Sequence, residues 1–133
     1  MTVHRFRGQR KQKTVRQLKK KADTLFSQVV RKRGHCELQF FGGKRCGGVL
    51  QCSHVFSRAR NSTRYNEENS FCACYGHHRY WHQHPIEATR FVENKYGREK
   101  LDMLQWKSQQ YKSWKVYELE ALIAELEQKL GGG

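Results

Sequence analysis

Cysteines and histidines with the spacing of metal ligands gather in one half of this 133-residue sequence. Cys74 and His77 are separated by two residues, so both can reach one ion where a helix begins. Cys36 and Cys46 lie on two short arms joined by a glycine-bearing turn, and they can complete a Cys3His set because loop closure costs grow slowly with length. Zinc accepts sulfur and nitrogen ligands in closed tetrahedral sites. We therefore predict a structural zinc at these residues, with Cys52 as the alternative to Cys46.

A second group of residues has the chemistry of phosphodiester hydrolysis. His78 follows His77 directly, and adjacent side chains on a helix diverge by about 100°, so His78 can face away from the zinc. His82 lies one turn later on the face of His78, and this pair can hold a catalytic divalent cation. His54 is the candidate general base, and the Asn69 amide can fix the adjoining loop and so orient His54. The alternative for His78 and His82 is a pair of solvent-exposed histidines.

These side chains require a hairpin and a helix to position them. Alternating apolar residues predict a strand over 50–57, followed by a polar loop over 58–68 and a short return strand over 69–72. A short helix can begin at His77 and end before Pro85. Helical periodicity and end signals predict further helices near residues 14–33, 85–96, 100–106 and 111–130.

The balance of charges is strongly positive. The chain has 26 Lys and Arg against 12 Asp and Glu, a formal net charge of +14. Such an excess fits a polyanionic partner, with nucleic acid the first candidate and a membrane surface the second. The alternative for the charges is a solvated face. We predict contacts to DNA phosphates by seven residues, namely Lys19, Lys20, Arg31, Lys32, Arg58, Arg60 and Arg64.

The cysteine count and the hydropathy bear on the compartment. Five cysteines in a chain without an apolar export signal favour thiolate ligands over a disulfide framework. No apolar run approaches transmembrane length, so we expect a soluble, unexported protein. Apolar residues make up only 37% of the chain, so a bound metal would help it to fold.

His54, Asn69 and His78 occur in the order of the HNH nuclease motif in its ββα-metal form. The sequence resembles the phage recombination protein NinG-like branch of that family, most strongly over 34–97, and the segments that carry the likeness are 50–58, 63–66, 69, 74–78 and His84-Pro85. The resemblance implies an α+β fold with a small ββα-metal (His-Me finger) core and a structural zinc knuckle. It also implies metal-dependent cleavage of DNA, with His54 as base, Asn69 as positioning residue and His78 as metal ligand.

The sequence departs from the common HNH pattern in three places. Ser53 stands where Asp or His, often a metal ligand, precedes the first histidine, which places more weight on His82 as the second protein ligand. His77 stands where the second cysteine of a Cys-x-x-Cys pair is usual. Cys36 and Cys46 are also further apart than the cysteines of a usual zinc knuckle.

We expect one nuclease domain over 14–130, with its core in 34–97 and C-terminal helices in 98–130. Residues 1–13 are expected to be a mobile basic arm and 131–133 a flexible glycine tail. The last helix is expected to pack on the domain, with a dimer seam as the alternative, so the protein is expected to be a monomer or a homodimer.

The leading hypothesis for function is a DNA endonuclease that uses His54 and a divalent cation such as Mg²⁺, Mn²⁺ or Ni²⁺. The resemblance implies branched or recombination DNA as substrate, and a bacteriophage protein in the cytoplasm of its bacterial host. The alternative is a non-catalytic, zinc-stabilised DNA-binding module, which would not require His54, Asn69 and His78 in this order. A toxin-like nuclease is a third hypothesis.

Overall fold

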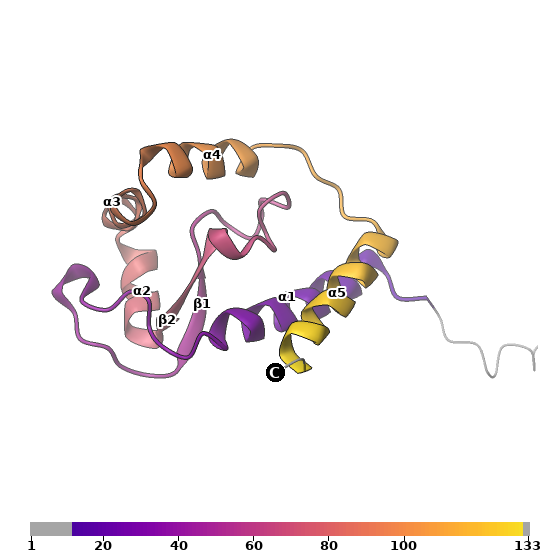
Figure 1. The fold of residues 1–133 in the computed structure, drawn as a ribbon, viewed down its shortest axis with the longest axis horizontal. Coiled ribbons are helices and arrows are strands. Elements are labelled where there is room, and N and C mark those ends of the chain that lie inside the picture. Colours follow the sequence, from indigo (N-terminus) through magenta and orange to yellow (C-terminus); the bar gives the residue numbers. More distant parts are fainter. Residues whose placement is uncertain (1–11, 132–133) are drawn as a thin grey trace, which may run out of the picture.

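The computed structural model describes residues 12–131 (Figure 1). Five α-helices and one two-stranded antiparallel sheet form this part of the chain, which therefore has the expected α+β class. Two short 3₁₀ helices, η2 (Phe41–Gly43) and η3 (Glu67–Asn69), lie in the connections. The main elements, in chain order, are α1 (Val15–Arg31), β1 (Leu50–His54), β2 (Ser70–Cys74), α2 (Tyr75–Gln83), α3 (Pro85–Tyr96), α4 (Arg98–Ser108) and α5 (Val116–Gly131).

The hairpin lies between α1 and α2 (Figure 1). Leu50 pairs with Cys74 at one end of the sheet, and His54 pairs with Ser70 at the other. α2 follows β2 with no intervening loop, because Cys74 is both the last residue of β2 and the N-cap of α2. Its sulfur accepts the backbone N–H of His77 at 3.4 Å, as N-cap side chains commonly do for the first turn of a helix.

The strand ends differ from the predicted ones for physical reasons. β1 ends at His54 instead of residue 57, because the Asn69 side chain, and not the partner strand, bonds to the backbone N–H and C=O of Phe56. β2 continues to Cys74 instead of ending at residue 72, and α2 consequently begins two residues before His77. Despite these shifts, His54 still lies in the first strand, as its last residue, and His77 still lies in the helix that follows the hairpin.

The first and last helices pack side by side (Figure 1). α1 begins with a capping box, in which Thr14 accepts the N–H of Gln17 and the Gln17 side chain accepts the N–H of Thr14. Its buried face has the predicted helical spacing and consists of Leu18, Ala22, Phe26 and Val30. α5 covers this face with Leu119, Ile123 and Leu126, so α1 buries the apolar stripe of α5 within the chain.

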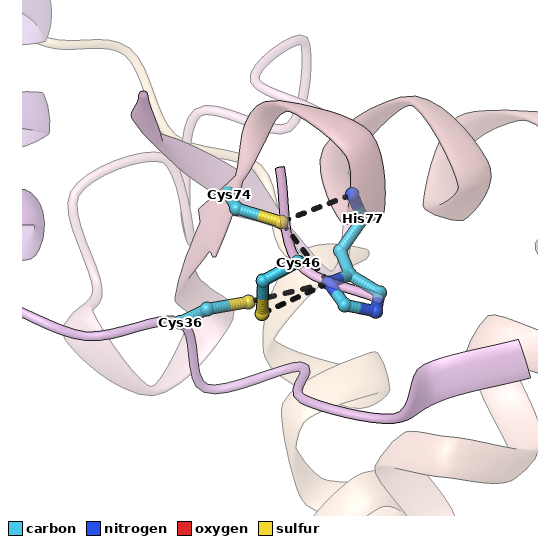
Figure 2. A group of neighbouring side chains, drawn as sticks. All are labelled: Cys36, Cys46, Cys74 and His77. Carbon is cyan, nitrogen blue, oxygen red and sulfur yellow. Dashed lines mark hydrogen bonds between the residues drawn. The ribbon is translucent and has the colours of Figure 1, made fainter. Parts of the chain in front are cut away.

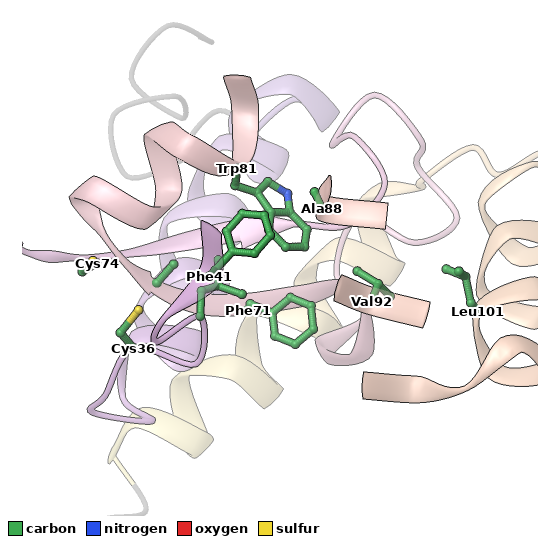
Figure 3. Packing of buried hydrophobic residues seen from close by; sticks show 10 residues of the cluster. Cys36, Phe41, Phe71, Cys74, Trp81, Ala88, Val92 and Leu101 are labelled. Atoms are coloured by element: carbon green, nitrogen blue, oxygen red, sulfur yellow. The ribbon is translucent and has the colours of Figure 1, made fainter. Parts of the chain in front are cut away.

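The hydrophobic core beside the hairpin joins β2 and α2 to the later helices (Figure 3). Phe71 of β2 and Trp81 of α2 have ring centroids 5.8 Å apart, and Phe41 lies 5.5 Å from Trp81. Val92 and Leu101 extend this core to α3 and α4. Because Phe41 lies between Cys36 and Cys46 in the sequence, apolar packing also fastens that loop to the hairpin.

The predicted ends of the chain lie mostly outside the described residues. The basic arm is described only at residues 12 and 13, and the glycine tail only at Gly131, which is the last residue of α5 and is helical instead of part of a flexible tail. The division into one domain with a core at 34–97 stays a prediction. Between residues 12 and 131, no helix combines the length and the apolar composition needed to cross a membrane.

Candidate functional site

Three cysteines and one histidine converge beside the first turn of α2 (Figure 2). Cys36 and Cys46 come from the loop after α1, Cys74 from the end of β2, and His77 from α2. Their ligand atoms all lie within 4.8 Å of one another. Cys46 is exposed and the other three are buried. This is the ligand set predicted from the sequence, with Cys46 and not Cys52 as its fourth member.

The distances within the group suit a tetrahedral ion. Nδ1 of His77 lies 3.5 Å from Sγ of Cys36 and 3.7 Å from Sγ of Cys46. It lies 3.0 Å from Sγ of Cys74, which is the tightest of the three separations. Usual Zn–S and Zn–N bond lengths would place such atoms about 3.6 Å apart. Nε2 of His77 lies 2.8 Å from the carbonyl oxygen of Lys44, which can only accept, so Nε2 carries the proton and Nδ1 is free for a metal.

Cys74 has the features of a thiolate ligand. Burial raises the pKa of its thiol, but the hydrogen bonds to the sulfur together lower the pKa to about 6. They include those from the backbone N–H groups of Gly47 and His77, each 3.4 Å from the sulfur. Desolvation, and after it the neighbouring Cys36 thiol, raises the pKa of Cys46 to about 11. A divalent cation would offset the repulsion between thiolates this close together and favour their ionised forms.

The glycines before β1 let the loop approach α2 closely. Gly48 has a φ of 86°, and a Cβ at this position would lie 2.6 Å from Cβ of Tyr75. The carbonyl of Gly47 accepts the backbone N–H of Gly76 at 2.9 Å. The loop therefore holds Cys46 against the start of α2, and the resulting Cys3His group could bind a zinc ion.

A second group of side chains lines a cleft of about 560 Å³ between α1, β1 and α2. The rings of His78 and His82 lie 4.5 Å apart between centroids and are perpendicular, on one face of α2 as their spacing predicted. Nδ1 of His78 lies 2.6 Å from Oγ of the buried Ser53. The titratable residues along the cleft are Asp23, Cys52, His54, Arg58, His78 and His82.

His54 lies at the end of β1 with its ring half-buried against Phe26. Desolvation lowers the pKa of His54 below its usual value, and the charge of Arg58 lowers it further, while the backbone of Arg64 partly opposes both. The ring is therefore neutral at pH 7. Its Nε2 is buried without a hydrogen-bond partner among the described residues. Nδ1 is thus the ring nitrogen that can accept a proton from a water in the cleft.

Asn69 is fully buried and fixes the connection between the strands. Its Oδ1 accepts the backbone N–H of Phe56 at 2.8 Å, and its Nδ2 donates to the carbonyl of Phe56 at 2.9 Å. Nδ2 also donates to the carbonyl of Thr63 at 3.2 Å. The backbone immediately after His54 is therefore held by one side chain, and Asn69 does not itself line the cleft.

The candidate catalytic metal has fewer ligands than the candidate zinc. Within the described part of the chain, only the Cys3His group brings three or more Cys, His, Asp or Glu ligand atoms together. His78 and His82 contribute two imidazoles, and the Ser53 hydroxyl is hydrogen-bonded to one of them. A metal ion bound by these two imidazoles would need substrate or water oxygens to fill its remaining coordination positions.

The seven residues predicted to contact DNA fall into two groups. Lys19 donates from Nζ to Asn61 at 2.9 Å, and Lys32 donates to the carbonyl of Lys129 near the end of α5 at 3.0 Å. Arg64 is likewise engaged within the chain, as described below. The side chains of Lys20 and Arg60 are exposed and have no hydrogen bond or ion pair with the described residues. Arg31 and Arg58 are also exposed, but Arg31 donates to Ser27 and Arg58 lies 3.8 Å from Asp23.

Asp23 is the residue of the cleft that the sequence interpretation missed. It accepts two hydrogen bonds from Arg64, at 2.8 and 2.6 Å, and Nη1 of Arg58 lies 3.8 Å from it. Asp23 is the only acidic residue before Glu37, so its isolation on a basic helix was the available signal. Arg64 is therefore a structural partner of Asp23, and its contact with a DNA phosphate stays a prediction.

Comparison with protein-family models, with curated proteins and with solved structures found no match to this chain.

Proposed function

We propose that this chain is a metal-dependent DNA endonuclease of the HNH type. The observation that carries the proposal is one cleft that is lined by His54 from the end of β1 and by His78 and His82 from α2. Two antiparallel strands with a helix directly after them position these side chains. The order and the elements are those that the HNH resemblance implies.

In this proposal His54 is the general base. Its neutral ring can take a proton from the attacking water at Nδ1, because desolvation keeps the imidazole unprotonated at pH 7. Asn69 is a positioning residue, because its side chain fixes the Phe56 backbone two residues after His54. Arg58, at the edge of the same cleft, can neutralise a phosphate oxygen.

His78 and His82 are the residues that would hold the catalytic cation. Two imidazole nitrogens suit Mn²⁺, Ni²⁺ or Zn²⁺ better than Mg²⁺, which prefers oxygen ligands. When bound, the cation would stabilise negative charge on the phosphate and on the leaving oxygen. Ser53 would fix the ring orientation of His78 through the 2.6 Å hydrogen bond between their side chains.

The Cys3His group is proposed to be a separate, structural zinc site. All four ligands come from the protein, which is the property of closed structural zinc sites. The zinc would join the loop after α1 to the junction of β2 and α2. It would thereby fix the start of the helix that presents His78 and His82.

Cleavage of supercoiled plasmid tests the nuclease proposal. Wild-type protein should cleave the plasmid with Mn²⁺ or Ni²⁺ and more weakly with Mg²⁺, while His54→Ala should lose about 10²- to 10⁴-fold in rate. Ser27→Ala, which changes another residue of the same cleft without an acid–base group, should cleave at the wild-type rate. Zinc content, measured on all three proteins, shows whether the Cys3His group and the fold are intact, and duplex binding shows whether the DNA-contacting surface is intact.

Equal cleavage by wild type and His54→Ala would contradict the role of His54. If neither protein cleaves DNA although both bind zinc and duplex, the chain is the non-catalytic DNA-binding module. The presence of only two imidazoles at the second site is the observation that favours this alternative.

A further inference from the structure

The segment 106–117 joins α4 to α5 (Figure 1). It combines aromatic and basic side chains that neither metal group uses. It contains four aromatic residues and three lysines, and it has no acidic residue. Trp106, Tyr111 and Tyr117 are 57%, 92% and 69% exposed. Single exposed apolar residues are ordinary, but three large rings within one short basic segment indicate a binding surface.

The fourth aromatic residue, Trp114, anchors this segment to the domain. Its Nε1–H donates to the carbonyl of Asn61 at 3.0 Å, and its ring packs edge-on against Tyr65 with centroids 5.3 Å apart. Lys112 places its ammonium 4.6 Å from the Trp114 ring, and the Lys112 carbonyl accepts from Asn61 Nδ2 at 3.1 Å. The backbone is thus held in place while the other three rings remain in solvent.

The loop between β1 and β2, which contains Asn61, connects this segment to the cleft. Ser62, the residue after Asn61, donates its hydroxyl to the carbonyl of Lys107 at 2.5 Å. Arg58 and Arg60 precede these two residues; both are exposed, and Arg58 lines the cleft. A nucleic acid strand engaged at the cleft can therefore follow the arginines of this loop to the lysines and rings of the segment.

We propose that residues 106–117 form a stacking surface for the unpaired bases of single-stranded DNA. Every base has a face that can stack on an aromatic ring, and lysines beside the rings neutralise the phosphates between bases. Lys112 is paired with Glu118 at 2.7 Å, but Lys107 and Lys115 form no ion pair with the described residues and can complement a polyanion. A protein partner would not require this positive charge beside the rings. The choice of DNA as the polymer rests on the proposed nuclease function.

The test compares the affinity of the whole protein for a short fluorescent oligothymidylate and for a duplex of equal length. Tyr111→Ser and Trp106→Ser should each weaken oligothymidylate binding about tenfold and leave duplex binding unchanged. Tyr111→Phe should retain wild-type affinity, because stacking needs the ring and not the hydroxyl. Met103→Ser removes an exposed apolar side chain of α4 that is 56% accessible and not aromatic, and it should have no effect on either affinity.

Three results would overturn this proposal. They are wild-type oligothymidylate affinity in both serine variants, equal losses on single strand and duplex, and failure of the wild-type protein to bind oligothymidylate. Thermal unfolding of each variant checks that the fold is retained. Plasmid cleavage is a separate readout, because ring-dependent binding without cleavage would contradict the nuclease proposal and leave the stacking surface intact.

Discussion

The Cys3His group and the histidine cleft lie on either side of the same short helix, and they are built in opposite ways. The Cys3His group has four protein ligands, with Nε2–H of His77 and the sulfur of Cys74 both bonded to backbone groups. The cleft has His82 and His78, whose ring is hydrogen-bonded to the buried Ser53, and an open volume of about 560 Å³. A closed ligand set suits a structural ion, whereas an open one leaves positions for substrate and water.

This difference shows how two adjacent histidines can serve two sites. His77 is fully buried and faces the cysteines, while His78 is half-buried and lines the cleft. The rotation of about 100° per residue in a helix is sufficient to separate them. If the proposed functions hold, substitutions in the first group should remove the zinc and destabilise the fold, whereas substitutions in the second should abolish cleavage and leave the zinc bound.

Removal of a zinc ligand should have the largest effect. Cys74→Ser should lose the zinc and more than about 4 kcal/mol of unfolding free energy, because binding of a structural zinc contributes directly to folding. Metal analysis and thermal unfolding with and without a chelator measure both quantities. Cys52→Ala is the matched control and should retain one zinc per chain, since Cys52 lies outside the group. Full zinc content in Cys74→Ser would disprove the ligand assignment.

Asn69→Ala should be the next most damaging change. It leaves the buried backbone groups of Phe56 and Thr63 without their partners, at a cost of about 2–4 kcal/mol measured by urea unfolding. Asn66→Ala, which removes one cap hydrogen bond to the N–H of Glu68, should cost only about 1 kcal/mol. Similar losses in the two variants would show that Asn69 has no special role in holding the loop after His54.

Substitution of two arginines in the loop between β1 and β2 should have different effects, one on stability and the other on DNA binding. Arg64→Gln should destabilise the fold by about 1–3 kcal/mol, because Asp23 loses two hydrogen bonds. Arg60→Gln should leave stability unchanged, weaken duplex binding and reduce its salt-dependence slope by about one. Equal salt slopes for wild type and Arg60→Gln would remove Arg60 from the DNA-contacting surface.

The smallest effect should be the pH dependence of the unfolding free energy that arises from His54. Because its pKa is lowered by desolvation, the unfolded chain binds a proton at higher pH than the folded one. The stabilising contribution of neutral His54 should be complete above about pH 6.5 and should fall as the pH drops towards the lower folded pKa. NMR titration of the ring and urea unfolding across this range measure it, with His54→Gln as the control. A folded pKa above the usual value would contradict this prediction.

The local signals in the sequence were sufficient for the elements and for the Cys3His group. Period-3.6 spacing placed α1, and the Cys74-x-x-His77 spacing identified the pair at the start of α2. Cys46 was preferred to Cys52 because it shares a glycine-rich bend with Cys36, and the structure brings those two together. These features depend on residues that are close in sequence or joined by one short loop.

The remaining contacts depend on tertiary packing, which the sequence pattern does not encode locally. The Asp23–Arg64 pair joins residues of α1 to the loop after β1, and Lys32 reaches the end of α5. A charged side chain that bonds within the chain cannot be distinguished by composition from one that is free for phosphate. The start of α5 at Val116 instead of residue 111 has a related cause, because Trp114 is anchored to Asn61.

Zinc analysis of His78→Ala, with plasmid cleavage measured on the same preparation, tests the division of the two histidines most directly. We predict one zinc per chain and loss of cleavage, because His78 faces the cleft and not the cysteines. Stability should fall by only about 1–3 kcal/mol, because the buried Ser53 hydroxyl loses its partner. Loss of the zinc from His78→Ala would show that His78 belongs to the Cys3His group and would contradict the assignment of the two sites.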